Sequence, residues 1–347
     1  MRHFASTVPV MREANILIAE EGDPKEIKVE APAFVPTLGP DDELWLMMGS
    51  TNAAVALGAF RQGVDVHQLS YARALPYVRA ARNRTSDEDA KVKISAEDVY
   101  ALANAHPDIF YPMYPGQGEV LDVISAWQQT MDAMKAREAY ANLVRSRLQQ
   151  QAVALGNAMS VKELAAKIEE QVGKKDPQDP GMQNFLSQED AAEKVLVKAL
   201  KNSELYKKVF EPIAHVGPKL AARFISAIER IERFETPKDL MRFAGMLPTH
   251  DGRLPSKRRG SLLSRSPELN NACFMLQEQM FKYGAKTEFG QILHDHVKLN
   301  CPCTEEERRA DKELRAKHVG AVKQARIAMS RVFLEHIWNG WRTHMGL

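Results

Sequence analysis

The chain has 347 residues and a formal net charge of +2, because 47 Lys and Arg stand against 45 Asp and Glu. This balance excludes a histone-like tail and an acidic disordered protein, and 44% hydrophobic with 27% charged residues is ordinary for a globular chain. No stretch approaches the ~18 apolar residues that cross a bilayer, and three cysteines suit a reducing compartment. We therefore expect a cytoplasmic protein that does not bind a membrane, with two domains at roughly 150 residues each.

Residues 1–115 show short apolar runs separated by turns, which is typical of an α/β domain. The run at 43–48 is apolar on both faces and bounded by turns, so it is expected to be a central strand. The elements expected in chain order are a strand over residues 4–10, a hairpin over 15–29, the central strand, a helix over 53–61 and a strand over 64–69.

Residues 116–209 have the spacing of long amphipathic helices. Apolar residues recur at steps of three and four from Val120 to Leu148, which predicts a long helix over 119–172, either continuous or broken at Gly156-Asn157. A second helix is expected over 188–205, after a loop near residues 173–181 that is rich in Pro and Gly. The region is therefore interpreted as a helical hairpin or coiled-coil stalk, whose apolar seam fits packing between its own helices better than a partner surface.

Residues 210–347 carry the most specific pattern. The segment 212–225 reads Pro-Ile-Ala-His-Val-Gly-Pro-Lys-Leu-Ala-Ala-Arg-Phe-Ile, which resembles a helix-hairpin-helix, with His215 where the first glycine of the usual turn would stand. In such a turn, backbone N–H groups and the N-terminus of the second helix face outward and can seat a DNA phosphate. We expect Val216, Gly217 and Lys219 to form this seat. The alternative is a corner between two helices that packs in the core.

A basic segment follows the hairpin and contains no acid across thirteen residues. Flexible cations in a stretch rich in Gly, Ser and Pro can neutralise a polyanion and release its counterions. A solvated charge run is the alternative, but beside a phosphate-binding hairpin we favour contact with nucleic acid. The cations are Arg253, Lys257, Arg258, Arg259 and Arg265.

The order of these motifs, from Phe210 to Trp341, resembles the C-terminal half of the Piv-type DEDD transposases. These are the pilin-inversion and IS one-ten insertion-sequence recombinases, some of them guided by a structured bridge RNA. The resemblance rests on the hairpin, on Phe243-Ala244-Gly245 followed by Pro248, on the basic segment and on the Ala-rich helix at 320–331. It implies an α/β plus all-α protein with DNA as its partner.

The resemblance also implies three domains. The first, residues 1–115, would be an RNase H-like (RuvC-like) domain, and residues 116–209 would be the long helical stalk. Residues 210–347 would be a C-terminal domain that contains the helix-hairpin-helix. A recombinase must hold two DNA ends together, so a homodimer or higher homo-oligomer is expected, with a structured guide RNA as a further partner in some members.

Four acidic residues that hold Mg²⁺ are implied by the same resemblance, because clustered carboxylates supply the oxygen ligands this ion needs. The first strand has no acid, and the central strand ends in Met47-Met48-Gly49 where an acid is expected. The last pair has two placements, which retain only Asp89 or only Asp98. Acids at turns remain as substitutes, with solvated charge as the alternative: Glu20, Glu21, Asp41, Asp42 and Asp87.

The resemblance implies a nucleophilic Ser in the basic segment as well. Alignment on Gly260 puts Leu254 at that position, and Ser256 is the nearest hydroxyl. Asp89, Asp98 and Ser256 are therefore the candidate catalytic residues. Fewer than two carboxylates cannot hold a catalytic metal pair, so the sequence favours a nucleic-acid-binding protein of transposase lineage with impaired or lost cleavage. The alternatives are an active metal-dependent recombinase, with or without an RNA guide, and a structural adaptor that binds no nucleic acid.

One further cluster has metal-ligand chemistry. His294, His296, Cys301 and Cys303 lie within ten residues and offer the soft ligands that structural Zn²⁺ takes. Their spacings, His-x-His and Cys-x-Cys, are tighter than the usual spacers. The sequence therefore favours no zinc here, although these four residues are the candidate metal ligands.

Overall fold

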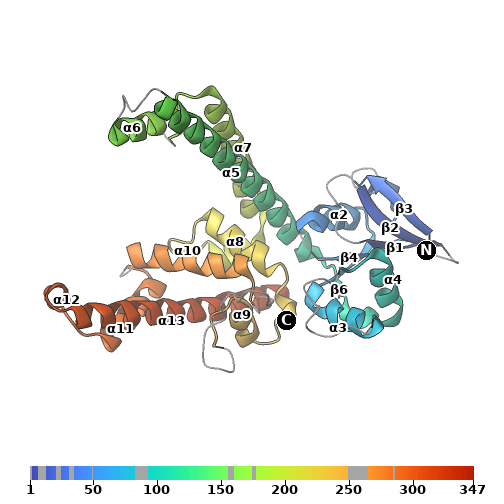
Figure 1. Ribbon diagram of the computed structural model, residues 1–347. Helices are drawn as coiled ribbons and strands as arrows, with labels where there is room; N and C mark the ends of the chain where they lie inside the picture. The colour runs from blue at the N-terminus through green and yellow to red at the C-terminus, as the bar shows by residue number, and fades with distance from the viewer. Residues whose placement is uncertain are drawn as a thin grey trace. The chain divides into compact units, whose positions relative to one another are not determined.

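The computed structural model describes residues 2–6, 13–20, 25–30, 35–48, 50–82, 93–154, 160–173, 177–248, 265–283 and 286–347. The chain divides into two compact units. Unit 1 comprises Met1–Ile124 and Ser203–Leu347, and unit 2 comprises Ser125–Asn202. Figure 1 shows their helices and strands.

The described residues of unit 1 include one six-stranded sheet with the strand order β3-β2-β1-β4-β5-β6. β1, β2 and β3 are antiparallel neighbours, β4 and β5 run parallel to β1, and β6 is antiparallel to β5. Their bounds are β1 (Arg2–Ser6), β2 (Glu13–Glu20), β3 (Lys25–Glu30), β4 (Glu43–Met47), β5 (Asp65–Leu69) and β6 (Tyr111–Pro112). The predicted hairpin and the strand–helix–strand unit are confirmed, while the first strand begins two residues earlier than expected.

Helices cover both faces of this sheet. The side chains of β4 are buried on both sides, as its continuous apolar sequence predicts. Trp45 and Met47 pack with residues of α3 and α4, including Val78 and Val99, and Figure 1 shows α2 on the opposite side. The bounds are η1 (Val35–Thr37), α2 (Ser50–Arg61), α3 (Tyr71–Ala81), α4 (Ala96–Ala105) and η3 (Pro107–Ile109).

Unit 2 is helical and contains most of α5 (Pro115–Ala154), with α6 (Val161–Val172) and α7 (Pro180–Asn202). Figure 1 shows α5 and α7 side by side, and Arg137 Nε donates to Glu189 Oε2 across them at 2.5 Å. A small core joins the three helices at Val144, Val172 and Met182. The apolar seam of the long helix therefore packs within the unit, as the sequence predicts.

The remaining helices of unit 1 pack around α13. Aromatic residues fill this core: Phe224, Phe333 and Trp341 are fully buried. The bounds are η4 (Tyr206–Phe210), α8 (Pro218–Ile228), η5 (Ile231–Arg233), α9 (Pro237–Phe243), α10 (Pro267–Tyr283), α11 (Glu288–Asn300), α12 (Glu305–Ala310) and α13 (Lys312–Met345). Among the described helices, none has the length and apolar character to span a membrane.

Candidate nucleic-acid interface

The predicted phosphate-binding turn connects η4 to α8. His215 has a φ of 65°, which is the left-handed conformation that glycine adopts most readily. The residue at the expected first-glycine position therefore takes the glycine-like backbone conformation. Its imidazole stacks on Tyr283, with the ring centroids 5.0 Å apart and the planes at 15°, so a contact with α10 accompanies this backbone.

The other two residues of the turn differ in exposure: Val216 is buried and Gly217 is exposed. Val216 is buried, and its N–H donates to Ile213 O at 3.1 Å. Gly217 is the N-cap residue of α8, Pro218 follows at the first helical position, and no side chain caps the helix. A Cβ added at Gly217 would meet no atom within 4 Å. The backbone at Gly217 is thus open, and it lies at the N-terminus of the eleven-residue helix α8, which is the positive end of the helix dipole. Lys219, which is half-buried, lies in the first turn of α8.

The Phe-Ala-Gly element forms the corner between α9 and α10. Gly245 has a φ of 72°, and a Cβ there would lie 2.5 Å from Cδ of Arg265. Ser266 N donates to Phe243 O at 2.7 Å, and Asn270 Nδ2 donates to Ala244 O at 2.9 Å. Glycine is needed at this corner both for its backbone conformation and for the close approach of Arg265.

Four of the five cations of the basic segment, Arg253, Lys257, Arg258 and Arg259, lie outside the described residues, as does Ser256. Arg265 is described and packs against Gly245 at the start of α10. The described end of the segment, Arg265, therefore lies at the corner that Gly245 makes.

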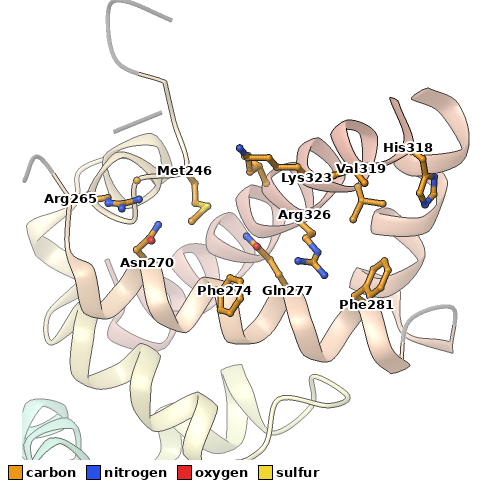
Figure 2. A pocket seen from close by; sticks show the side chains of 13 residues that line it. Met246, Arg265, Asn270, Phe274, Gln277, Phe281, His318, Val319, Lys323 and Arg326 are labelled. Carbon is orange, nitrogen blue, oxygen red and sulfur yellow. The ribbon is translucent and has the colours of Figure 1, made fainter. Parts of the chain in front are cut away.

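A cavity of about 570 Å³ lies between α10 and α13, beside this corner. Figure 2 shows Lys323 and Arg326 extending from α13, and the rings of Phe274 and Phe281 extending from α10. Arg326 pairs with Glu278 at 2.8 Å, and its guanidinium lies 4.8 Å from the ring centroid of Phe281. This cavity could not be predicted from the sequence, because most of its lining comes from two helices that are separated in the chain. The lining includes Met246, Arg265, Asn270, Phe274, Gln277, Phe281, His318, Val319, Lys323 and Arg326.

The carboxyl ends of β1, β4 and β5 meet at one edge of the sheet, because these strands are parallel. The strands end at Ser6, Met47 and Leu69, so none of them ends in an acid. Beyond β4, the buried Asn52 donates from Nδ2 to Met47 O at 2.7 Å. By strand register, the acids nearest this edge are Glu13 and Glu30. They lie opposite each other on the antiparallel strands β2 and β3.

The substitute acids lie at the opposite edge wherever they are described. In the register of β1 and β2, Glu20 lies opposite Arg2, which is the first residue of β1. Asp41 and Asp42 precede β4, and Asp42 Oδ2 accepts a hydrogen bond from Gly39 N at 2.8 Å within the turn that leads into this strand. These three residues therefore cannot complete a carboxylate cluster at the carboxyl edge. Glu21 and Asp87 lie outside the described residues.

Asp98 stabilises the start of α4. It forms a capping box with Ser95, in which Asp98 Oδ2 accepts from Ser95 N at 2.6 Å and Ser95 Oγ accepts from Asp98 N at 3.2 Å. The same oxygen lies 2.5 Å from Nη2 of Arg82. Among the described residues, the contacts of Oδ2 are therefore those of a helix cap and an ion pair. Asp89, the competing candidate, lies outside the described residues.

The predicted metal ligands separate into two groups. Cys301 and Cys303 lie together, with their sulfurs 3.0 Å apart, and the third member of their cluster is His318 from α13. His294 instead stacks on Phe281, with ring centroids 6.4 Å apart. His296 Nδ1 lies 2.9 Å from Asn300 Nδ2. The structure thus brings His318 to the two cysteines in place of the two histidines that the spacing suggested.

A fully buried arginine ties the hairpin region to the sheet. Arg230 lies between α8 and η5 and is 0% exposed. It donates to Gln68 Oε1 at 3.3 Å, to Tyr111 O at 3.0 Å and to Pro112 O at 2.6 Å, and it pairs with Glu232 at 3.0 Å. Its burial could not be predicted from the sequence, because four of the five residues at 229–233 are charged, which is typical of a solvated surface.

Residues 207–263 match the model of the Transposase IS116/IS110/IS902 family. The match begins in η4 and includes the turn at His215, α8, α9 and the corner at Gly245, which are motifs that the resemblance rested on. It supports the transposase resemblance of this part of the chain. No curated protein matches the sequence.

Proposed function

We propose that the chain is a nucleic-acid-binding protein of transposase lineage that holds DNA phosphates at the turn before α8. The observation that carries the proposal is the φ of 65° at His215 next to the open Gly217. A histidine in the left-handed region costs conformational energy that a glycine would not. The turn thereby has the backbone geometry of a helix-hairpin-helix, and this supports its use in binding a phosphate.

The sheet supports an RNase H-like N-terminal domain. Its order, three antiparallel strands followed by two strands parallel to β1, agrees with what the resemblance implies for this domain. In such a fold, catalytic carboxylates would lie at the carboxyl edge, where β1, β4 and β5 end without an acid. A neutral end offers Mg²⁺ no charge to offset its dehydration. We therefore propose that DNA cleavage is impaired or lost, and that binding is the retained activity.

The experiment titrates labelled double-stranded DNA with the protein at several salt concentrations, and fluorescence anisotropy measures the binding. Replacing Lys257, Arg258 and Arg259 by Ala should lower the slope of log affinity against log salt by ~2 to 3, at about one for each lost phosphate contact. A matched control replaces three cations of α7, Lys194, Lys198 and Lys201, and should leave the slope unchanged. An equal slope for the wild type and the basic-segment variant would contradict the proposed phosphate contacts. The ratio of absorbance at 260 and 280 nm of the purified protein shows whether structured RNA stays bound.

A further inference from the structure

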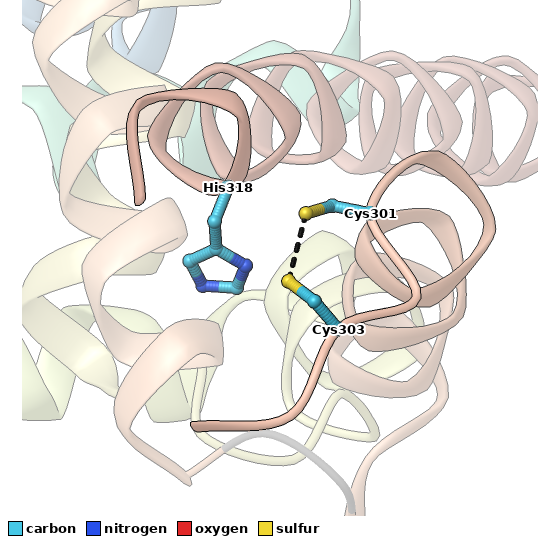
Figure 3. Close-up of side chains that lie close together, drawn as sticks. All are labelled: Cys301, Cys303 and His318. Atoms are coloured by element: carbon cyan, nitrogen blue, oxygen red, sulfur yellow. Dashed lines mark hydrogen bonds between the residues drawn. The ribbon is translucent and has the colours of Figure 1, made fainter. Parts of the chain in front are cut away.

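We propose that Cys301, Cys303 and His318 form a Zn²⁺ site that clips the end of α11 to the first turns of α13. The ligand atoms of these three residues all lie within 4.8 Å of one another. Figure 3 shows the two thiols turned toward each other and the imidazole facing them from the neighbouring helix. Two thiols and one imidazole are a ligand set that zinc takes when one coordination position is left for water.

The local backbone explains how a spacing of one residue can serve one ion. Cys303 N donates to Cys301 O at 2.9 Å, so Pro302 lies at the centre of a three-residue turn, a geometry that suits the fixed φ of proline. This turn brings the sulfurs to 3.0 Å. Two thiolates on a tetrahedral Zn²⁺ lie ~3.8 Å apart, given Zn–S bonds of ~2.3 Å. A small rotation of the side chains therefore opens the pair to the ion.

Caps on both sides hold the cluster in place. Cys301 N donates to Val297 O at 2.8 Å and ends α11. Thr304 and Glu307 form a capping box at the start of α12, and Asp311 caps α13 through the N–H of Glu313 at 2.7 Å. The ligands thus stand on backbone that is fixed before any metal binds, which limits the conformational entropy that binding would cost.

The neighbouring arginine leaves His318 able to act as a ligand. Arg308 Nη1 lies 2.9 Å from Nε2 and 3.1 Å from Nδ1 of His318. A guanidinium can only donate, so at least one ring nitrogen keeps its lone pair. Binding would exchange Arg308 for the ion at this nitrogen, and the two thiol protons would leave to solvent.

The site is tested on the full-length, tag-free chain, reduced and stripped of metal with a chelator. Titration with Zn²⁺ against a chromophoric chelator should show one ion per chain, and Co²⁺ in its place should give sulfur-to-cobalt charge-transfer absorption. Loss of a second-shell partner typically costs 10 to 100-fold in affinity, so Cys303→Ser and His318→Asn, which remove ligands, should each weaken binding by at least ~100-fold. Zn²⁺ should raise the thermal midpoint of the wild type and of neither variant.

His294→Asn is the matched control, since it removes a nearby histidine that lies outside the cluster. It should bind Zn²⁺ with the wild-type affinity. Circular dichroism establishes that each variant is folded before titration. A wild-type chain that takes up no Zn²⁺, a His318→Asn variant that binds as well as the wild type, or a metal-free chain whose two thiols are already joined in a disulfide would each overturn the proposal.

Discussion

Nη1 of Arg230 lies 3.3 Å from Oε1 of Gln68 on β5, and both side chains are buried. The same guanidinium donates to the carbonyls of Tyr111 and Pro112 on β6. The side chain of Arg230, which follows α8, thus donates hydrogen bonds to the last two strands of the sheet, β5 and β6. A buried charge with this many partners is costly to remove, because each partner would lose its hydrogen bond without regaining water.

Replacing Arg230 by Met should therefore destabilise the protein. We expect a loss of about 3 kcal/mol in the free energy of unfolding, as is typical when one member of a buried ion pair is removed. Urea denaturation followed by circular dichroism measures this loss. Arg242→Met is the control, since Arg242 makes an exposed pair with Asp239 and should change stability by less than ~1 kcal/mol. Equal effects of the two substitutions would show that the buried contacts of Arg230 contribute nothing.

Gly245 and Gly320 should respond in opposite directions to substitution by Ala. Gly245 has a positive φ and lies against Arg265, so Gly245→Ala should cost at least ~1 kcal/mol. Gly320 lies within α13, with open space around it, so Gly320→Ala should stabilise by up to ~1 kcal/mol. Thermal unfolding of the two variants tests the signs. A Gly245→Ala variant as stable as the wild type would mean that the corner between α9 and α10 tolerates a side chain.

Asp98 is expected to matter for stability and to have no part in cleavage. Removing its capping contacts in Asp98→Ala should cost ~1 kcal/mol, about the same as Asp239→Ala, which removes the equivalent residue of the capping box at α9. Neither variant should differ from the wild type when supercoiled and branched DNA is incubated with Mg²⁺ or Mn²⁺, because no metal-dependent nicking is expected.

Three results would contradict the loss of cleavage. Nicking that disappears in Asp98→Ala or Asp89→Ala, or strand exchange that disappears in Ser256→Ala, would show a surviving active site at the predicted residues. Nicking that disappears in Glu13→Gln would place the carboxylates on β2, at the same edge of the sheet as the end of β1. A co-purifying RNA must be retained in these assays, since a guide would be needed for activity.

The proposed transposase lineage predicts that the chain forms oligomers, because a recombinase must bring two DNA sites together. We expect at least a dimer at micromolar concentration, with or without nucleic acid. Multi-angle light scattering coupled to size exclusion measures the mass. A value near 39.0 kDa, the mass of one chain, under both conditions would rule out the dimer.

Much of the fold could be predicted where sequence signals are local. The hairpin of β2 and β3, the buried β4 and the parallel β5 follow from apolar runs and turn residues that are neighbours in sequence. The limits of the prediction lie in contacts that depend on tertiary packing. His318 joins Cys301 only because α13 packs on α11, and spacing along the chain pointed to His294 and His296 instead. Arg230 could not be assigned to the interior, because four of the five residues at 229–233 are charged.

The turn before α8 lies between these two cases. The sequence predicted its position, yet His215 in place of glycine argued against the geometry. The structure shows His215 with a positive φ and stacked on Tyr283 of α10. Tertiary contacts can hold a residue in a conformation that its own preference disfavours, and the partner ring lies 68 residues away in the chain. A contact between residues this far apart in the chain cannot be predicted from the local sequence.

The most direct test of nucleic-acid binding at the turn compares Gly217→Asp with Gly217→Asn. Gly217 has a φ of −72° and open space around it, and both side chains are good helix N-caps, so both variants should fold at least as well as the wild type. They differ only in the charge placed where the phosphate would lie. We predict that Gly217→Asp weakens binding to double-stranded DNA by at least ~10-fold, equivalent to ~1.4 kcal/mol, while Gly217→Asn and the remote Gly320→Asp retain the wild-type affinity. Equal affinity of the Asp and Asn variants at Gly217 would contradict phosphate binding at this turn.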